Sequence, residues 1–194
     1  MSKEQLFIFD TTLRDGAQTQ GVDFSVDDKM KIASALDNLG VDYIEGGWPG
    51  ANPTDTEFFQ KKHSFNNAKL TSFGMTKRTG RSADNDPGLS ALLNSNTPAV
   101  CIVGKSWDFH VDIALGISNE ENLENIKETA KHFVKENKEF MFDAEHFFDG
   151  YKANSSYALS CLKSAFDEGA RWIVLCDTNG GTLPHEVTKI VTEV

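Results

Sequence analysis

Short apolar runs alternate with longer amphipathic stretches along the whole chain. The run Leu6–Phe9 is too short for a helix and predicts a buried strand, and five later runs have the same character. Apolar residues on both faces of a strand indicate a sheet that is covered on both sides. The predicted strands are Leu6–Asp10, Asp42–Gly46, Leu70–Phe73, Ala99–Gly104, Phe140–Phe142 and Trp172–Cys176.

Three of the intervening segments carry apolar residues at helical spacing. The first follows a capping box at Ser25–Asp28 and stops at Gly40, the second opens with the capping box Ser118–Glu121, and the third is ended by Gly169. The predicted buried stripes are Val26, Met30, Ala33, Leu36 and Leu39, then Leu123, Ile126, Ala130, Phe133 and Val134, then Ala158, Cys161, Leu162 and Ala165.

This alternation predicts an α/β fold with a parallel sheet. The predicted strands start about 33 residues apart, so eight units would need about 265 residues, close to the roughly 250 of a (β/α)8 barrel. The 194 residues hold six units, which fits either a complete doubly wound sheet or a barrel that stops two units early. No GxGxxG or GxxxxGK[ST] phosphate loop follows the first strand. Polar groups follow every strand instead, which favours a TIM (β/α)8-type barrel truncated to about six βα units.

Composition narrows the class of protein. Hydrophobic residues make up 39% and charged residues 25%, and no apolar run approaches the roughly 18 residues of a membrane span. The net charge of −10 argues against a nucleic-acid partner. Three widely spaced cysteines without a CxxC pair predict reduced thiols in the cytoplasm.

Charged residues follow the first predicted strand directly. Arg14 and Asp15 come after Asp10–Leu13, and Gln18 lies close behind them. Ligands bind at the carboxyl ends of the strands in parallel α/β proteins. Asp15 is a hard oxygen ligand suited to a divalent cation, and Arg14 offers donors for a carboxylate or a developing enolate oxygen. The alternative is an ion pair in a surface loop.

The ends of the second and fourth predicted strands are less specific. Glu45 is followed by a turn rich in glycine and proline, Gly46–Pro53, which is either a simple turn or one wall of a site. Lys105 lies among aromatic residues in Gly104–Val111. It either binds a carboxylate or covers a pocket, or the run is a surface loop with a docked tryptophan.

Two later strand ends carry further polar groups. Asp143 and Glu145 lie two residues apart, so both face the same side of a strand. They serve either general acid–base chemistry or a structural ion pair. Thr178 and Asn179 offer neutral donors beside Gly180–Gly181, as an anion site or as the turn before a helix.

Four runs together resemble one enzyme family, the 2-isopropylmalate, citramalate and homocitrate synthase group of the barrel metallolyase superfamily. The runs Gly46–Gly50 and Gly104–Asp108 are most similar to the citramalate synthase branch. The resemblance spans the chain from end to end. The four runs are Phe9–Gly16, Glu45–Gly50, Gly104–Asp108 and Cys176–Gly181.

The resemblance implies an acyltransferase that joins the methyl carbon of acetyl-CoA to the keto carbon of a 2-oxo acid and then hydrolyses the thioester. The 2-oxo acid would be pyruvate in the citramalate branch. A divalent cation (Mg, Mn or Zn) would polarise the carbonyl, with Asp15 as a metal ligand. Arg14 matches the electrophilic partner of the substrate oxygen, Thr178 the residue that binds the substrate carboxylate, and Glu145 the catalytic carboxylate that assists proton removal. The substrate-binding candidates are Arg14, Gln18, Lys105 and Thr178.

The resemblance also implies a cytoplasmic homodimer in amino-acid biosynthesis, of isoleucine or leucine, and a His-x-His metal pair on the strand after Asp177–Gly181. None of the five histidines forms such a pair, and the sequence ends at Val194 before that strand. We therefore expect residues 1–194 to be an incomplete (β/α)8 catalytic domain that lacks the last two βα units and the C-terminal regions. Such a chain should be weakly active or inactive by itself.

Two alternatives remain. A lyase of the same superfamily, which cleaves a hydroxyacyl-CoA or a hydroxy-keto acid, would share the Arg–Asp start, although the runs at Gly46–Gly50 and Gly104–Asp108 speak against it. A non-catalytic domain that binds a small anion is the other. Titration with Mn²⁺ would distinguish it, because tight binding by this chain alone would need further ligands such as His110 or His146.

Overall fold

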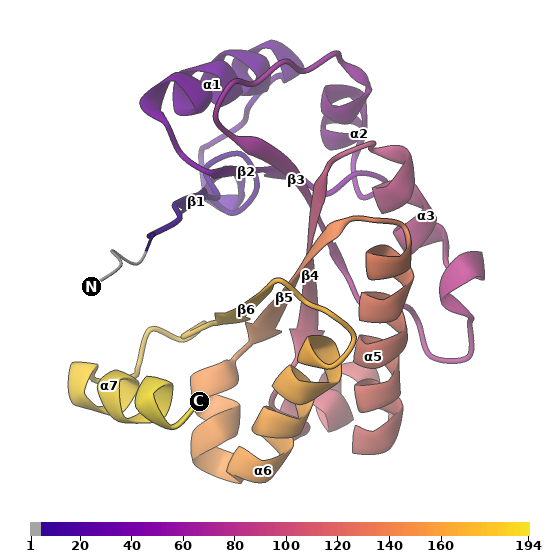
Figure 1. Ribbon diagram of the computed structural model, residues 1–194, viewed down its shortest axis with the longest axis vertical. Helices are drawn as coiled ribbons and strands as arrows, with labels where there is room; N and C mark the ends of the chain where they lie inside the picture. Colours follow the sequence, from indigo (N-terminus) through magenta and orange to yellow (C-terminus); the bar gives the residue numbers. More distant parts are fainter. Residues whose placement is uncertain (1–4) are drawn as a thin grey trace. The chain divides into compact units, whose positions relative to one another are not determined.

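The computed structural model describes residues 5–194, in which strands and helices alternate (Figure 1). The strands are β1 (Phe9–Asp10), β2 (Tyr43–Gly47), β3 (Lys69–Met75), β4 (Ala99–Lys105), β5 (Glu139–Glu145) and β6 (Trp172–Leu175). The helices are α1 (Val26–Leu39), α2 (Pro53–Gln60), α3 (Pro87–Asn94), α4 (Asp108–His110), α5 (Asn119–Lys135), α6 (Phe147–Phe166) and α7 (Pro184–Glu193). Single turns lie at η1 (Gly16–Gln18), η2 (Ala83–Asn85) and η3 (Val111–Leu115). In this part of the chain, no helix is both long and apolar enough to cross a membrane.

The chain divides into two compact units. The first unit is the chain up to Gly74 together with Ser90–Cys101, and the second is Met75–Leu89 with Ile102–Val194. In the first unit β1 pairs in parallel with β2, and β2 with β3. In the second unit β5 pairs in parallel with β6.

Strand order follows chain order from β1 to β6. A doubly wound sheet reverses its strand order at a switch point, whereas a (β/α)8 barrel never does. The predicted fold class, a (β/α)8-type barrel represented by six βα units, is therefore confirmed.

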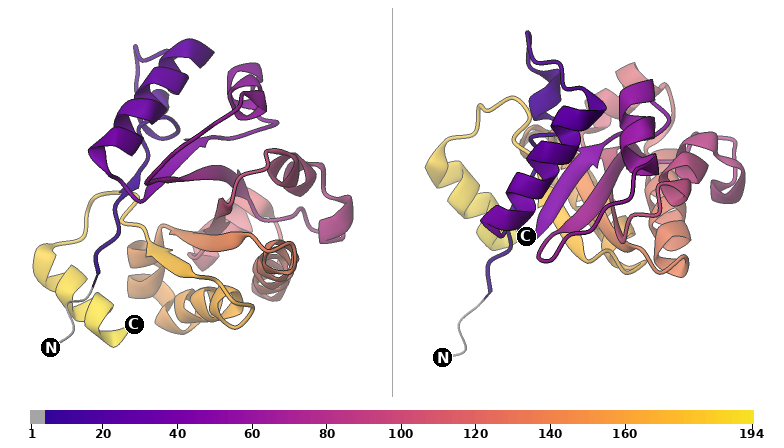
Figure 2. Two further views of the ribbon diagram at one scale, coloured as in Figure 1. Left: turned by 45° about the horizontal axis from the view of Figure 1, so that its top comes forward. Right: turned by 90° about the horizontal axis from the view of Figure 1, so that it is seen from above.

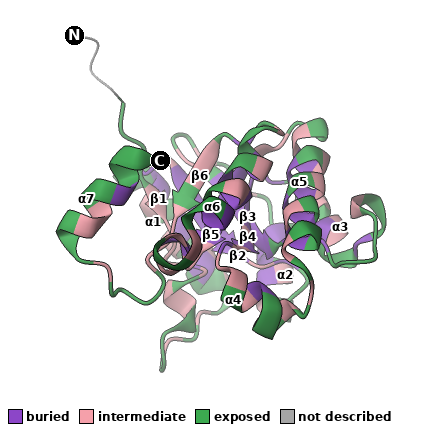
Figure 3. Cartoon of the chain, turned by 90° about the horizontal axis from the view of Figure 1, so that it is seen from below, coloured by how far each residue is buried: buried purple, intermediate pink, exposed green. Residues whose placement is uncertain are grey.

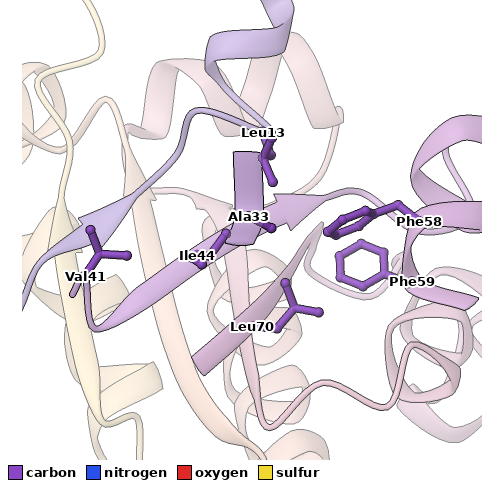
Figure 4. Packing of buried hydrophobic residues seen from close by; sticks show 7 residues of the cluster. All are labelled: Leu13, Ala33, Val41, Ile44, Phe58, Phe59 and Leu70. Carbon is purple, nitrogen blue, oxygen red and sulfur yellow. The ribbon is translucent and has the colours of Figure 1, made fainter. Parts of the chain in front are cut away.

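The core of the first unit lies between α1, α2 and the strands β2 and β3, and α1 runs alongside β2 (Figure 2). The capping box at Ser25–Asp28 is formed, and Gly40 ends α1 with φ of 88°, so the predicted boundaries of this helix are confirmed. Figure 4 shows the buried apolar side chains of this core, which come from α1, α2, β2, β3 and the adjoining loops. They are Leu13, Ala33, Val41, Ile44, Phe58, Phe59 and Leu70.

The prediction of a buried first strand over Leu6–Asp10 is wrong for most of its length. Only Phe9–Asp10 form β1, and Leu6 is 88% exposed. The backbone carbonyl of Ile8 accepts from Tyr43, which places this segment next to β2 on one side. No strand of residues 5–194 pairs with the other edge of β1, so Leu6, Phe7 and Ile8 remain exposed.

The predicted stripe of α1 also fails at its end, where Leu39 is 77% exposed. Asp37 is buried in its place. Its carboxylate accepts the backbone N–H groups of residues 66–68 at 2.8–3.0 Å, and these hydrogen bonds hold the pKa of Asp37 below its usual value. A satisfied carboxylate therefore closes this end of the helix.

The second unit packs α5 and α6 against β5, and α6 also against β6. The box Ser118–Glu121 caps α5 as predicted. Figure 3 shows buried residues in the strands and on α5 and α6, whereas α7 is mostly exposed, with Glu186 and Val187 half-buried and Ile190 buried. All four residues of the third predicted stripe are buried in α6.

Helix α6 is longer than its predicted stripe. It starts at Phe147, ends at Phe166 before Gly169, and is interrupted at Asn154, where φ is −150° and ψ is 81°. The Asn154 side chain accepts from the backbone N–H of Tyr157 at 3.2 Å, as an N-cap residue does. The stripe therefore predicts the second helical half, which begins at this internal cap.

Candidate functional site

A tight turn after β1 positions Arg14 and Asp15. The carbonyl of Thr11 accepts the backbone N–H groups of Arg14, Asp15 and Gly16 at 2.9–3.1 Å. Asp10 accepts from the backbone N–H of Thr12 at 2.9 Å, which fixes the first residues of the turn. The polar residues after the first strand therefore share one ordered turn.

The Arg14 guanidinium is held between a carboxylate and an aromatic ring. Its Nε donates to Oε2 of Glu45 at 2.7 Å, and Glu45 is fully buried within β2. The guanidinium carbon lies 4.0 Å from the centroid of the Phe73 ring, and Trp48 meets the same ring edge-on at 5.6 Å. These contacts leave the planar guanidinium few orientations. Glu45 is thus part of this group rather than only of a turn.

Asp15 lies on the solvent side of this group. Its carboxylate is 63% exposed and accepts from Nη1 of Arg14 at 3.1 Å. Gln18 is also exposed, and with Arg14 it lines a pocket in this unit. The other residues that line the pocket are Leu13, Ala17, Val22, Asp23, Phe24, Lys29, Trp48, Ala51, Asn52, Thr54 and Asp55. The structure therefore brings Arg14, Asp15 and Gln18 together in the first unit, as the sequence predicts.

A buried ion pair fixes the loop after Glu45. Lys29 of α1 pairs with Asp55 of α2 and also donates to the carbonyl of Gly46 at 3.0 Å. Asp55 accepts from the backbone N–H of Trp48 at 2.8 Å. Gly47 has φ of 139°, and a Cβ there would lie 2.5 Å from the Asp55 carboxylate carbon, so only glycine fits.

In the second unit Glu145 ends β5 and forms an ion pair with Lys105 at the end of β4. Both side chains are about one-quarter exposed, at 27% and 24%. The buried Ser106 hydroxyl donates to the backbone carbonyl of Glu145 at 2.7 Å and holds this end of the strand. The ion-pair alternative for Glu145 is therefore realised, and its predicted catalytic role stays a prediction.

Thr178 belongs to a second polar group of this unit. Its Oγ1 accepts the backbone N–H of His146 at 2.9 Å. Nδ1 of the His146 ring lies 3.0 Å from Oδ2 of Asp149. The side-chain amide of Asn179 donates to the same oxygen at 2.8 Å. The loops after β5 and β6 are therefore linked twice. Asp143, the other predicted carboxylate, accepts from Cys176 at 2.5 Å instead.

Aromatic rings cover one side of His146. The rings of His110 and His146 meet edge-on, with their centroids 4.5 Å apart. The centroid of the Trp107 ring lies 4.7 Å from that of the His110 ring. Burial lowers the pKa of His110 below its usual value, and the neighbouring His146 and Lys105 act in the same direction. The carboxylates of Glu145 and Asp149 act in the opposite direction but do not outweigh burial.

Residues 5–194 do not complete a divalent-metal site. Asp15 offers one exposed carboxylate, but no group of three or more His, Cys, Asp or Glu side chains within residues 5–194 is arranged to hold a metal ion. Three or more protein ligands are usual for a tightly bound ion. The role of Asp15 as a metal ligand therefore stays a prediction.

Several residues of these groups were missed by the sequence analysis. Phe73 lies under Arg14 and was predicted only as part of a strand. Lys29 carried a detectable signal, because it is four residues before Ala33 on the apolar face of α1. Asp149 carried a weaker one, three residues after His146.

Comparison with known proteins gives the family. The family model described as HMGL-like matches residues 5–194. The chain is 55% identical over 193 residues to the (R)-citramalate synthase of Aquifex aeolicus, covering 98% of this chain and 37% of that protein. It is 50% identical over 189 residues to the (R)-citramalate synthase of Geobacter sulfurreducens, covering 96% of this chain and 36% of that protein. The chain therefore spans little more than a third of the length of these relatives.

More distant relatives agree with this placement. The 2-isopropylmalate synthase of Staphylococcus carnosus is 32% identical over 191 residues, with 94% of this chain and 35% of that protein covered. A solved hydroxymethylglutaryl-CoA lyase from Bacillus subtilis superposes with a TM-score of 0.79 at 17% identity, covering 97% of this chain and 63% of that one. At that identity the likeness shows the fold alone. The resemblance read from the four sequence runs is confirmed, and the chain belongs to the HMGL-like family.

Proposed function

We propose that the protein condenses acetyl-CoA with a 2-oxo acid, preferentially pyruvate, and then hydrolyses the thioester. The observation that carries the proposal is the sequence identity of 46–55% to five proteins named (R)-citramalate synthase, over almost all of this chain. Identity to proteins named 2-isopropylmalate synthase is only 31–33%, which favours the smaller 2-oxo acid.

Arg14 would act on the keto oxygen of the 2-oxo acid. As the new carbon–carbon bond forms, the carbonyl π electrons move onto that oxygen, and a fixed guanidinium stabilises the growing negative charge. The contacts of Arg14 with Glu45 and Phe73 support this role, because a preorganised donor needs no reorientation during the reaction.

Glu145 would take the proton from the methyl group of acetyl-CoA, directly or through a relay. The methyl carbon then attacks the keto carbon, the resulting alkoxide takes a proton from water, and water cleaves the thioester to give CoA thiol and a hydroxy diacid. Lys105 holds one carboxylate oxygen of Glu145, so proton transfer would use the other oxygen. Thr178, exposed at its loop, would donate to the substrate carboxylate, and Gln18 and Lys105 would complete substrate binding.

The remaining partners are part of the same proposal. Asp15 would contribute one carboxylate to a divalent cation. None of the three cysteines is part of a disulfide, which suits a reducing compartment such as the cytoplasm. A homodimer of the protein is expected, and light scattering will test it.

The test uses the protein as its gene encodes it. Acetyl-CoA and pyruvate are supplied with Mg²⁺ or Mn²⁺, and thiol release is followed against 3-methyl-2-oxobutanoate as the competing 2-oxo acid. We expect CoA release with pyruvate, a loss of about 100-fold or more in Arg14→Lys and Glu145→Gln, and no change in the surface control Lys163→Ala, whose side chain is 73% exposed. If neither pyruvate nor 3-methyl-2-oxobutanoate gives CoA release, the proposal is refuted. Cleavage of a hydroxyacyl-CoA by the same preparation would support the lyase alternative.

A further inference from the structure

His146 has a backbone conformation that its side chain does not favour. Its φ and ψ are 54° and 34°, in the left-handed region, directly after β5 and before the first residue of α6. A residue with a Cβ pays of the order of 1 kcal/mol or more for this conformation, and such residues concentrate at functional sites. Something in the surrounding structure must therefore hold it.

Two groups of contacts hold this residue. The backbone N–H of His146 donates to Thr178 Oγ1 at 2.9 Å. The ring Nδ1 lies 3.0 Å from Asp149 Oδ2, and Asn179, the neighbour of Thr178, donates to that same oxygen at 2.8 Å. The His146 and Asp149 side chains are largely buried, at 13% and 22% exposure, so neither contact is a loose surface pair.

The hydrogen bond to Thr178 has a directional consequence. A hydroxyl oxygen has one proton to donate and two lone pairs that accept. The N–H of His146 occupies one lone pair, so the Thr178 proton must point away from His146. Within residues 5–194 no acceptor is found for that proton, and the Thr178 side chain is exposed. The hydroxyl is therefore set as a donor toward solvent or a ligand.

We propose that His146 is a positioning residue, whose left-handed backbone, locked by the chain His146–Asp149–Asn179, aims the Thr178 hydroxyl at the carboxylate of the 2-oxo acid. This inference rests on the proposed function for the identity of the ligand. It assigns to His146 a role through its backbone, whereas its ring acts only as an anchor.

The test compares substitutions that tolerate the left-handed region with substitutions that resist it. Asn and Gly adopt positive φ readily, whereas a β-branched residue does not. The equilibrium Kd for pyruvate, measured by calorimetry with the protein as its gene encodes it, is the main readout, and KM and kcat for CoA release are the second. We expect His146→Val to raise Kd and KM about tenfold or more, because the substrate carboxylate would lose one hydrogen bond and such a loss has about this magnitude. His146→Asn and His146→Gly should recover most of that loss.

Two further measurements separate positioning from folding. Asn137 also has positive φ, 58°, just before the opposite end of β5, so Asn137→Val imposes the same backbone strain there and should leave Kd unchanged. Thr178→Val removes the hydroxyl itself, and the double variant His146→Val/Thr178→Val should bind no more weakly than Thr178→Val alone. Asn179→Ala, at an exposed side chain, should weaken binding without unfolding the protein.

The outcomes distinguish the two proposals. Wild-type protein that binds pyruvate but releases no CoA refutes the proposed function and leaves the Kd series to decide on His146. Equal Kd values in His146→Val and His146→Asn, additive losses in the double variant, or a loss of kcat alone in His146→Gly would each overturn the positioning role. Failure of pyruvate to bind at all would refute both.

Discussion

Neutralising Asp55 tests how the loop that follows Glu45 is held. The Lys29 side chain is only 3% exposed and that of Asp55 11%, so the ion pair lies out of solvent. The pair also ties down the loop, because Lys29 donates to the Gly46 carbonyl and Asp55 accepts from the Trp48 N–H. Asp55→Asn keeps the size of the side chain but leaves the ammonium of Lys29 without a counter-charge.

The expected loss follows from the cost of an unpaired buried charge. Removing one partner of a buried ion pair costs about 3–5 kcal/mol, whereas removing both charges is often close to neutral. In the double variant Lys29→Met/Asp55→Asn, the hydrogen bond to Gly46 is lost, at a cost of about 1 kcal/mol. The double variant should therefore be more stable than Asp55→Asn. For a domain of this size the single change lowers Tm by about 6–20 °C.

Urea unfolding of the wild type, both single variants and the double variant measures the four free energies of the cycle. Unchanged m values show that the same surface unfolds in each variant. The expected result is a double variant whose loss is smaller than that of Asp55→Asn alone. Single variants within about 0.5 kcal/mol of wild type, or a double variant whose loss equals the sum of the two, would refute the buried-pair reasoning.

Three other expectations follow from the described contacts. Arg14→Lys should fold normally yet lose about 100-fold or more in kcat/KM, because an ammonium cannot keep both the contact with Glu45 and the stacking on Phe73; activity within threefold of wild type would contradict this. Burial lowers the pKa of His63 from its usual 6.5. Below about pH 6.5 His63 is therefore more protonated in the unfolded chain than in the folded protein. The free energy of unfolding should therefore decrease as pH falls from 7 to 5, and His63→Gln should show a shallower slope in urea titrations; parallel slopes would refute it. Burial raises the pKa of the Cys161 thiol to about 12, so iodoacetamide at pH 8 should leave Cys161 unmodified in the native protein, as peptide mass mapping will show.

The sequence predicts the architecture well where local signals and tertiary packing agree. The capping boxes at Ser25–Asp28 and Ser118–Glu121 and the stop at Gly40 are local signals, and all appear in the structure. The first strand was overextended because hydrophobicity alone cannot show whether a neighbour covers an edge, and Leu6 is exposed. The first half of α6 was missed because the internal cap at Asn154 divides it from the apolar stripe.

The candidate site was predicted in part, for a related reason. Adjacent residues such as Arg14 and Asp15 meet wherever their turn is formed, so sequence alone finds them. The contact of Arg14 with Glu45 joins residues 31 positions apart and depends on the pairing of β1 with β2. A polar residue on an apolar helix face, as at Lys29, indicates a buried partner but does not say which residue it is.

The charges around Arg14 indicate which chemical group binds best beside its guanidinium. One guanidinium faces two carboxylates, those of Glu45 and Asp15, so the three side chains together carry a charge of −1. An incoming carboxylate would be repelled by this sum, whereas a neutral carbonyl oxygen would still meet the N–H donors of the guanidinium. In protein freed of divalent cations, added salt should thus screen the repulsion and strengthen, rather than weaken, the binding of an anionic ligand near Arg14.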